Sequence, residues 1–362
     1  MRNERGKAWF LLGVFGLGML GVVGGCNVGP DSVSRDRIDY GEALARSSRE
    51  ELLRNIVRLR YLESPVFLSI NSVVNQYTVE GTFNAGATWA FGAAPGTGNA
   101  LGAKTTFSDR PTITYSPLGG RRFARAYLRP VPTSSVLSLV QSGYRVDFLF
   151  PLLVDSINLH RNGFRSGRVE VPTDPEFTQI VELLASMQDR GEFHIRAESG
   201  PKGELATSRD FIVFDPNGDP GGLARLKELE SLLGISEGTR QVEVRTGTET
   251  GSNGTISIST KSLLRIMSSL SVEVDVPQRE VDRGTVRVRD GGPELPGSRI
   301  RIPSASERPQ ESYVAIEHQG YWYWIGQDDL DSKEIFLWVL MLTNLTDTDD
   351  GSDAPILTIP AG

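Results

Sequence analysis

Apolar residues recur with two spacings along this chain, and the spacing separates predicted helices from predicted strands. The first helical stripe consists of Leu52, Ile56 and Leu59. Ser48 and Glu51 form the pattern of an N-terminal capping box, which predicts that this helix begins near residue 48. Helical spacing in 133–141 and 146–160 predicts two buried helices, and the apolar run 66–70 predicts a buried strand.

The segment 76–92 alternates almost strictly between apolar and polar residues. The apolar set consists of Tyr77, Val79, Gly81, Phe83, Ala85, Ala87, Trp89 and Phe91. Successive side chains of a strand point to opposite faces, so this set is expected on one face and the intervening polar residues on the other. Weaker alternation returns at 101–107 after a link rich in Gly, Ala and Pro. The pattern predicts a long amphipathic β-hairpin near residues 76–109.

The second half of the chain alternates helical and strand-like segments. The predicted helices are 175–190, 223–233, 263–270 and 335–345, and the predicted strands are 193–197, 211–214, 242–245 and 255–259. A tight turn at Gln319-Gly320 predicts a hairpin between 313–317 and 321–325. The last helix is apolar on nearly every side, which predicts full burial, and Asp331 with Glu334 resembles its capping pair.

Together these elements predict an α+β fold with mixed helices and mostly antiparallel sheet, organised in two subdomains. The boundary is placed near Arg165, where the rhythm of the elements changes. The expected organisation is a signal peptide at 1–25, a tether at 26–42, an N-terminal α+β domain with the long hairpin at 43–164 and a C-terminal α+β domain at 165–362.

The N-terminal segment combines a positive start, an apolar run and a cysteine preceded by small residues. The apolar run extends from Ala8 to Val23 and is followed by Gly24-Gly25-Cys26. A membrane-spanning helix needs about 20 apolar residues, so this run is short for a span and suits a removable signal. The motif resembles the bacterial lipobox, which implies lipidation of Cys26, cleavage before it and acylation with chains such as palmitate. Because Asn27 rather than aspartate follows the cysteine, the resemblance implies the periplasmic face of the outer membrane.

Composition narrows the classes of function. The chain has 362 residues, a formal net charge of −7 and one cysteine, and its hydrophobic content of 39% is sufficient for a folded core. A dispersed negative charge argues against nucleic-acid binding. With Cys26 lipidated, no thiol is left for a disulfide, a catalytic nucleophile or a thiolate metal site.

Two surfaces are candidates for recognition. The basic cluster consists of Arg121, Arg122, Arg125 and Arg129. It is a candidate patch for an anionic partner, either lipid headgroups or a periplasmic polyanion, and a solvated helix face is the alternative. The aromatic run 321–324 is a candidate ligand or glycan face, with burial of both faces as the alternative.

Motifs that indicate cofactors, metals or catalysis are incomplete in this sequence. Residues 96–105 lack the contiguous Gly-Lys-Ser/Thr of a phosphate-binding loop, because Ala103 intervenes. Residues 215–226 lack the glycine and the final glutamate of a calcium loop. The three histidines form no metal-spaced pair, and no Gly-x-Ser-x-Gly elbow occurs. We therefore assign no catalytic, cofactor or metal residue, and an enzyme is the less favoured class.

Three hypotheses of function follow. The first is a membrane-anchored envelope lipoprotein with a structural or partner-binding role, attached through Cys26 and acting with an envelope protein or as a homo-oligomer. The second is an oligomeric outer-membrane pore or secretion component that inserts the 76–109 hairpin, with Tyr77, Val79, Phe83, Trp89 and Phe91 as the membrane or partner face. The third is an enzyme that acts on envelope glycans or lipids, which a pocket gathering several carboxylates would favour.

Overall fold

The computed structural model describes the backbone of residues 30–74, 77–85, 101–109, 112–166, 169–198, 209–216, 218–248, 254–287 and 300–346. Side chains are described in these ranges except at 30–37, 69–115 and 344–346. Contacts divide the chain into two compact units, Met1–Glu51 and Leu52–Gly362. The fold is α+β with mostly antiparallel sheets, as the sequence predicts.

Helix α2 (Pro30–Arg60) begins well before the expected start at Ser48. The Ser48 hydroxyl donates to the carbonyl of Leu44 at 3.0 Å, one turn back, and so does not act as a cap. The capping-box prediction is therefore wrong, and residues 30–42 of the expected tether are helical. The predicted apolar stripe is confirmed within the second unit, where Leu52 and Ile56 are buried.

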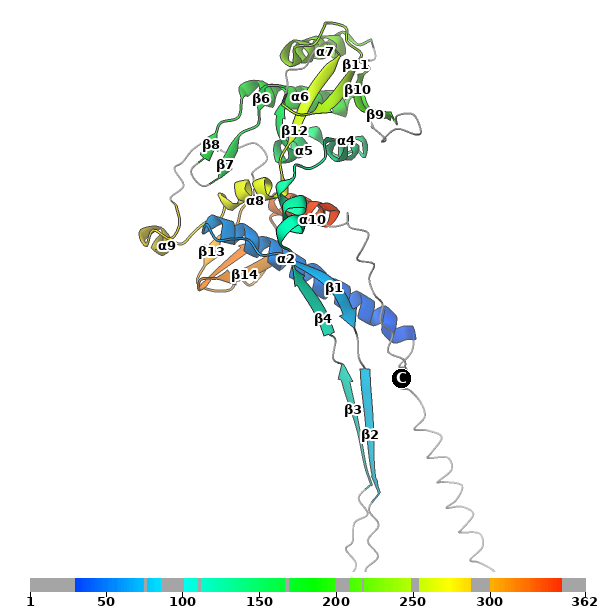
Figure 1. Cartoon of the computed structure of the whole chain (residues 1–362), viewed down its shortest axis with the longest axis vertical. Coiled ribbons are helices and arrows are strands. Elements are labelled where there is room, and N and C mark those ends of the chain that lie inside the picture. The colour runs from blue at the N-terminus through cyan, green and yellow to red at the C-terminus, as the bar shows by residue number, and fades with distance from the viewer. Residues whose placement is uncertain are drawn as a thin grey trace, which may run out of the picture. The chain divides into compact units, whose positions relative to one another are not determined.

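Four strands form an extended two-stranded ribbon. Strand β1 (Leu68–Val74) pairs antiparallel with β4 (Thr112–Pro117), and β2 (Tyr77–Ala85) pairs antiparallel with β3 (Leu101–Asp109). Val74 pairs with Thr112, and Tyr77 pairs with Asp109. Both members of the second pair lie three residues from the first pair, in the direction of the hairpin tip. From Ser72 onward both strand pairs therefore share one register, and Figure 1 shows them following one another. The predicted hairpin is confirmed over the described residues.

The largest sheet has six strands in an order that does not follow the sequence. From one edge to the other these are β6 (His160–Arg161), β5 (Val154–Ile157), β12 (Thr255–Thr260), β11 (Gln241–Thr246), β10 (Arg209–Phe214) and β9 (Phe193–Glu198). Only β11 and β12 run parallel to each other. The sheet combines strands from both sides of the boundary expected near residue 165, because β5 pairs directly with β12.

Helices pack on this sheet and on one another (Figure 1). They are α4 (Thr133–Gln141), α5 (Val146–Leu153), α6 (Pro175–Asp189) and α7 (Pro220–Leu233). The predicted helix 146–160 ends early, at Leu153, because Val154 is already extended and starts β5. The segment Val154–Ile157 has two β-branched residues that are buried in the sheet, and this tertiary setting overrides the helical spacing.

Short elements connect the sheet to the C-terminal part. They are α3 (Gly120–Phe123), the π-helix η1 (Ala124–Leu128), β7 (Phe164–Ser166), β8 (Val169–Val171), α8 (Leu263–Ser271) and α9 (Gln278–Asp282). Strands β7 and β8 form an antiparallel pair, and η1 contacts both α8 and the last helix. These elements join the predicted subdomains, since one continuous cluster of buried apolar residues extends from Leu52 to Leu342.

The C-terminal part consists of a small sheet and helix α10. The sheet has the order β13 (Ser304–Ala305), β15 (Tyr321–Ile325) and β14 (Val314–His318). Gln319 and Gly320 have positive φ angles of 50° and 82°, as a tight hairpin turn requires, so the predicted hairpin is confirmed.

Helix α10 (Leu330–Thr346) differs from its prediction in two respects. Its cap is Asp329, whose carboxylate accepts from the Ser332 amide at 3.1 Å and from the Ser332 hydroxyl at 2.8 Å, so the expected Asp331–Glu334 capping pair is wrong. The predicted full burial of 335–345 is also wrong, because Leu337 and Met341 are exposed by 45% and 39%. Among the helices of the described residues, none is both long enough and apolar enough to cross a bilayer.

Candidate functional site

A pocket of about 700 Å³ lies among three helices that are far apart in the sequence. Its lining comes from the segment before α5, from α5 itself, from the middle of α6 and from the first turns of α10. The apolar lining residues are Phe148, Pro151, Phe177, Val181 and Ile335, and the carboxylates are Asp147, Glu182, Asp331 and Glu334. The pocket is thus acidic with an apolar interior lining.

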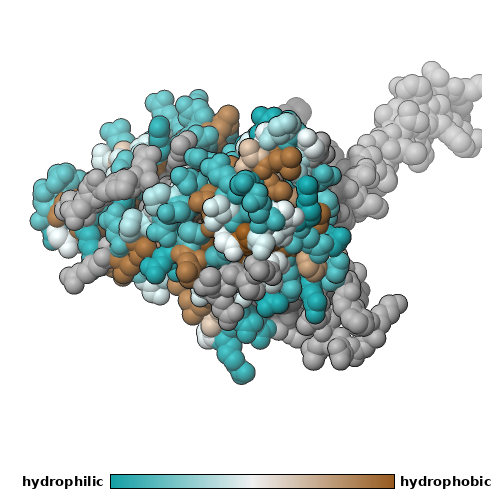
Figure 2. Space-filling model, turned by 90° about the horizontal axis from the view of Figure 1, so that it is seen from above, coloured by the Kyte–Doolittle hydropathy of each residue, from teal (hydrophilic) through white to brown (hydrophobic). Residues whose placement is uncertain are grey.

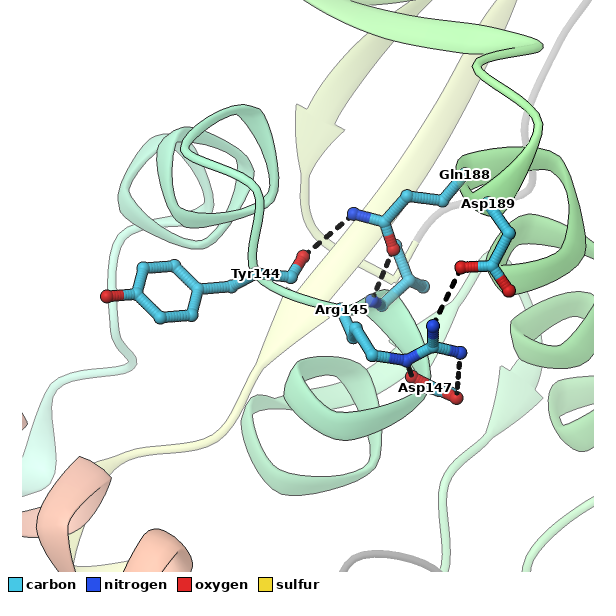
Figure 3. Close-up of polar contacts among 6 residues, drawn as sticks. Tyr144, Arg145, Asp147, Gln188 and Asp189 are labelled. Atoms are coloured by element: carbon cyan, nitrogen blue, oxygen red, sulfur yellow. Dashed lines mark hydrogen bonds and ion pairs between the residues drawn. The ribbon is translucent and has the colours of Figure 1, made fainter.

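One edge of the pocket is held by Arg145. Its guanidinium donates to both carboxylate oxygens of Asp147, at 2.9 and 2.7 Å, and to Asp189 at 2.7 Å. Figure 3 shows this arginine between the two carboxylates. The hydrogen bonds from Arg145 to Asp147 and Asp189 raise the pKa of the guanidinium above its ordinary value, so it is charged at neutral pH. Asp147 therefore adds little free negative charge to the pocket.

The amide of Gln188 fixes the backbone that precedes α5. Its Nε2 donates to the Tyr144 carbonyl at 2.8 Å, and its Oε1 accepts from the Val146 amide at 2.9 Å (Figure 3). The Val146 amide has no partner within its own helix, because it lies in the first turn. Gln188 on α6 therefore caps α5 from outside and sets the position of Arg145.

The other three carboxylates are not neutralised in the same way. Glu182, Asp331 and Glu334 are exposed and make no ion pair or hydrogen bond with the described part of the chain. They come from α6 and from the first two turns of α10, where carboxylates also complement the positive end of the helix dipole. The arrangement favours a ligand with a cationic group and an apolar body.

Aromatic rings connect the pocket to α10. Tyr144 contacts Trp338 edge-on at 4.6 Å between ring centroids, and Phe148 lies 6.4 Å from the same ring. Trp338 is buried, whereas Tyr144 is 42% exposed at the edge of the pocket. Within the described residues, no group of three or more His, Cys, Asp or Glu side chains is arranged to hold a metal ion.

The residues that the sequence predicts for membrane and partner contacts are only partly described. Cys26, Trp89 and Phe91 lie outside the described residues. Tyr77, Val79 and Phe83 lie in β2, where the register pairs Val79 with Phe107 and Phe83 with Ala103. Directly paired positions share one face of an antiparallel ribbon, so these apolar positions of the two strands fall on the same face.

The basic cluster follows the ribbon directly in the chain. Arg121 and Arg122 lie in α3, Arg125 lies in η1 and Arg129 follows η1, and all four side chains are exposed. The buried residues of this segment are Ala126 and Tyr127. The structure thus brings the four arginines together on the outer side of one short helical segment.

The aromatic run and two of the histidines, His160 and His318, have structural partners. Tyr323 is fully buried, and its neighbours Tyr321, Trp322 and Trp324 are partly buried, with Arg308 lying 5.1 Å from the centroid of Trp322. His160 Nε2 lies 2.9 Å from the Leu232 carbonyl, and His318 lies 3.4 Å from Glu63. Asp219 of the rejected calcium loop caps α7 through the Gly222 amide at 3.0 Å, which confirms the expectation of a turn before a helix.

Sequence reasoning missed the pocket as a site. It preferred a helix-capping role for Asp331 and Glu334 over an acid pair, and it gave no role to Glu182, Asp147 or Arg145. Their separation along the chain leaves no periodic signal that links α5, α6 and α10. The one available signal was the pair of carboxylates that precede the most apolar helix.

No known protein family, no curated protein and no solved structure matches this chain.

Proposed function

We propose that this protein is an envelope lipoprotein, attached to the membrane through Cys26, that binds a partner by strand pairing along the ribbon. The observation that supports the proposal is the open ribbon itself. Over the described residues, the β1–β4 and β2–β3 pairs form two-stranded sheets whose outer edges pair with no further strand. Unpaired strand edges are templates for pairing with another chain.

The length of the ribbon strengthens this proposal. An isolated two-stranded hairpin is marginally stable in water, and three or more strands with an apolar face are needed for independent stability. The described pairs keep one register from Ser72–Thr114 to Ala85–Leu101, and a β-bulge between Ile70 and Ser72 shifts the register at the start of β1. A third strand would satisfy the backbone groups of an edge and cover the face that the apolar positions share.

Membrane anchoring is tested by Cys26→Ala. The variant is expected in the soluble fraction or as uncleaved precursor without acyl chains, while the wild type stays in the membrane through a carbonate wash. Mass spectrometry of the wild-type N-terminal peptide provides the direct readout. An unmodified Cys26 in that peptide would contradict the anchor.

Strand pairing is tested with single cysteines in the ribbon, which form disulfides only between chains. Thr82 of β2 and Lys104 of β3 pair with each other within one chain. If β2 of one copy pairs with β3 of the next, a mixture of Thr82→Cys and Lys104→Cys chains should crosslink and neither should do so alone. Crosslinking of one variant with itself indicates that the same strand of two copies pairs with itself. The matched control is Leu159→Cys, which is 62% exposed in a turn distant in sequence from the ribbon.

Deletion of residues 81–107 separates partner binding from membrane insertion. Loss of a detergent-stable oligomer on deletion, without any leakage from wild-type vesicles, supports strand pairing at the membrane surface. Leakage of wild-type vesicles that the deletion abolishes supports the pore or secretion component. A wild type that is monomeric in detergent and in membranes, together with Thr82→Cys and Lys104→Cys variants that crosslink to no other chain, would contradict both.

A second candidate function, an enzyme acting on envelope glycans or lipids, is favoured by the pocket. Three carboxylates without a described partner gather there from separate helices, and paired carboxylates are the usual acid and base of glycan hydrolysis. The test is mass spectrometry of peptidoglycan and lipid extracts after incubation with the protein. Glu182→Gln, Asp331→Asn and Glu334→Gln should abolish any turnover, whereas Glu176→Gln, exposed on the same α6, should not. Turnover that survives all three substitutions would exclude the pocket.

A further inference from the structure

Helix α10 carries an apolar stripe on its exposed side. Leu330, Leu337 and Met341 are exposed, and we call these three residues the α10 stripe. Successive residues of an α-helix are about 100° apart around its axis, so positions 330, 334, 337 and 341 fall on one narrow face. The residue at position 334 is Glu334, which also lines the pocket. The α10 stripe is therefore continuous with the pocket and extends along about three turns of the helix.

Exposed apolar side chains are concentrated at this helix. Of the twelve large hydrophobic residues that are exposed in the described part of the chain, three form the α10 stripe, and a fourth, Tyr144, packs edge-on against Trp338. Figure 3 shows the Tyr144 ring pointing away from the group around Arg145. On the face seen in Figure 2, by comparison, hydrophobic residues occur in separate spots among hydrophilic ones. A run of exposed apolar residues on one face of a helix is typical of a surface that binds a partner.

The pocket beside the stripe has an apolar interior and an acidic mouth. Its apolar lining residues Phe177, Val181 and Ile335 are buried. The carboxylates that have no partner in the described part of the chain are exposed, and they are Glu182, Asp331 and Glu334. The pocket can therefore take an apolar side chain inside while cationic groups lie around its mouth, as in an interface with an apolar core and a polar rim.

The charge around α10 selects the partner further. Two aspartates precede the helix at 328–329, and residues 347–353 after it include four aspartates and no Lys or Arg. The one basic residue in the sequence of α10 is Lys333, whose ammonium donates to the Gln327 carbonyl at 3.0 Å and lies 5.2 Å from the centroid of the Tyr313 ring. An anionic bilayer surface or a nucleic acid is repelled by this charge, whereas a partner that carries Lys or Arg is attracted.

The length of the stripe favours a helix as the partner. From position 330 to position 341 the stripe extends over about 16 Å, and a second helix can follow it along this whole length. Amphipathic helices that bind a surface of this kind place their own apolar residues at the same spacing. A small cation would occupy the pocket and leave Leu337 and Met341 uncovered.

We propose that α10 and the pocket bind a cationic amphipathic helix of a partner protein. One apolar side chain of that helix enters the pocket, the others cover the α10 stripe, and its Lys or Arg residues face Glu182, Asp331 and Glu334. This contact depends neither on the ribbon nor on Cys26, so it is separate from the binding and the anchoring proposed above. Because the same carboxylates carry the second candidate function, helix binding is measured without any glycan or lipid substrate.

The experiment measures the fluorescence anisotropy of a labelled synthetic peptide added to the full protein in discs of neutral phosphatidylcholine. The peptide has about 18 residues, enough to extend beyond the stripe, with leucine at heptad positions a and d and lysine at e and g. One control peptide has glutamate in place of lysine, and another has the same composition in scrambled order. Empty discs give the lipid background. If the chain carries no acyl group, the same titration is done in buffer, so a failed anchor does not affect the result.

The lysine peptide should bind the wild type, and two kinds of variant should weaken it. Leu337→Ser removes an apolar contact and should weaken binding about tenfold. Asp331→Asn with Glu334→Gln should weaken binding about fivefold at low salt and less at high salt. The matched controls are Leu223→Ser, exposed on α7, and Glu176→Gln, exposed on α6, and both should leave the affinity unchanged.

Several results would overturn the proposal. These are no binding of the lysine peptide, binding that neither Leu337→Ser nor Met341→Ser weakens, and equal affinity for the glutamate peptide or the scrambled peptide. Binding that occurs only after deletion of residues 347–362 would show that the C-terminal segment of the chain itself covers the stripe. Self-association of the protein that Leu337→Ser abolishes would assign the stripe to a second copy, and either outcome would also overturn the proposal.

Discussion

The hydroxyl groups of Tyr61 and Tyr323 lie 2.6 Å apart in the core and join the end of α2 to the β14–β15 hairpin. Both side chains are buried, and their rings meet edge-on at 6.3 Å between centroids. Burial raises the pKa of Tyr323, and the hydrogen bond to Tyr61 acts in the same direction. Both hydroxyls are therefore neutral at physiological pH, and the contact is a hydrogen bond between two uncharged groups.

Replacing Tyr61 with Phe should lower the free energy of unfolding by about 1–3 kcal/mol, because the Tyr323 hydroxyl is left buried without its partner. The double variant Tyr61→Phe with Tyr323→Phe should regain part of this loss, since neither hydroxyl is then buried alone. Urea unfolding of both single variants and the double variant gives the coupling energy. If the losses of the two single variants add up to the loss of the double variant, the hydrogen bond between the two hydroxyls makes no net contribution to the free energy of unfolding.

Lys261 gives the stability of the second unit a specific pH dependence. Its ammonium is buried and donates to the Pro151 carbonyl at 2.9 Å, and burial lowers its pKa to about 8 from 10.5. Below pH 8 the group is charged in both the folded and the unfolded state, so the full cost of burying the charge is present. Between pH 8 and 10.5 the folded amine is neutral while the unfolded one still binds a proton, so the free energy of unfolding rises with pH, by about 3 kcal/mol in all.

The Lys261→Met variant should lose this rise. The measurement is the difference in urea-unfolding free energy between wild type and variant at a series of pH values from 7 to 11. Lys227→Met is the control, because Lys227 is exposed on α7 and should leave the slope unchanged. A wild type and a Lys261→Met variant with parallel pH profiles would contradict the lowered pKa.

Asn55→Ala should loosen the base of the ribbon. The substitution removes both hydrogen bonds to the Val66 backbone and leaves a gap at a fully buried position, so a loss of about 2–4 kcal/mol in unfolding free energy is expected. Amide hydrogen exchange of β1 and β4 should accelerate more than that of the six-stranded sheet. The neighbouring Arg54→Ala, at an exposed position of the same helix, should leave both exchange rates unchanged.

Gln188→Ala should destabilise the edge of the pocket without touching its carboxylates. Two hydrogen bonds to the segment before α5 are lost, which should cost about 1–2 kcal/mol. Gln179→Ala changes an exposed glutamine of the same helix and should be nearly neutral. Thermal unfolding compares the two, and equal melting temperatures would show that Gln188 does not fix this edge.

The sequence predicted those elements whose structure depends on local pattern. The ribbon was predictable because alternation and a glycine-rich link act over neighbouring residues, and the Gln319-Gly320 turn because it needs positive φ angles. The start of α2 at Pro30 was missed because a capping box at Ser48 is compatible with a helix interior once its hydroxyl bonds one turn back. The end of α5 at Leu153 was missed because pairing of β5 with β12, about a hundred residues away, decides it. The exposed side of α10 and the pocket depend on tertiary packing, which apolar content alone does not specify.

The pairing of Tyr61 with Tyr323 also joins residues that are 262 positions apart in the chain. The paired strands of the ribbon lie within some fifty residues of one another in the sequence, so their pairing is local compared with the contacts of the core. Tyr61 has no partner for its hydroxyl until residue 323 is available, and β5 has no partner in β12 until residue 258 is. These long-range contacts are therefore expected to form more slowly than the pairing of the ribbon strands.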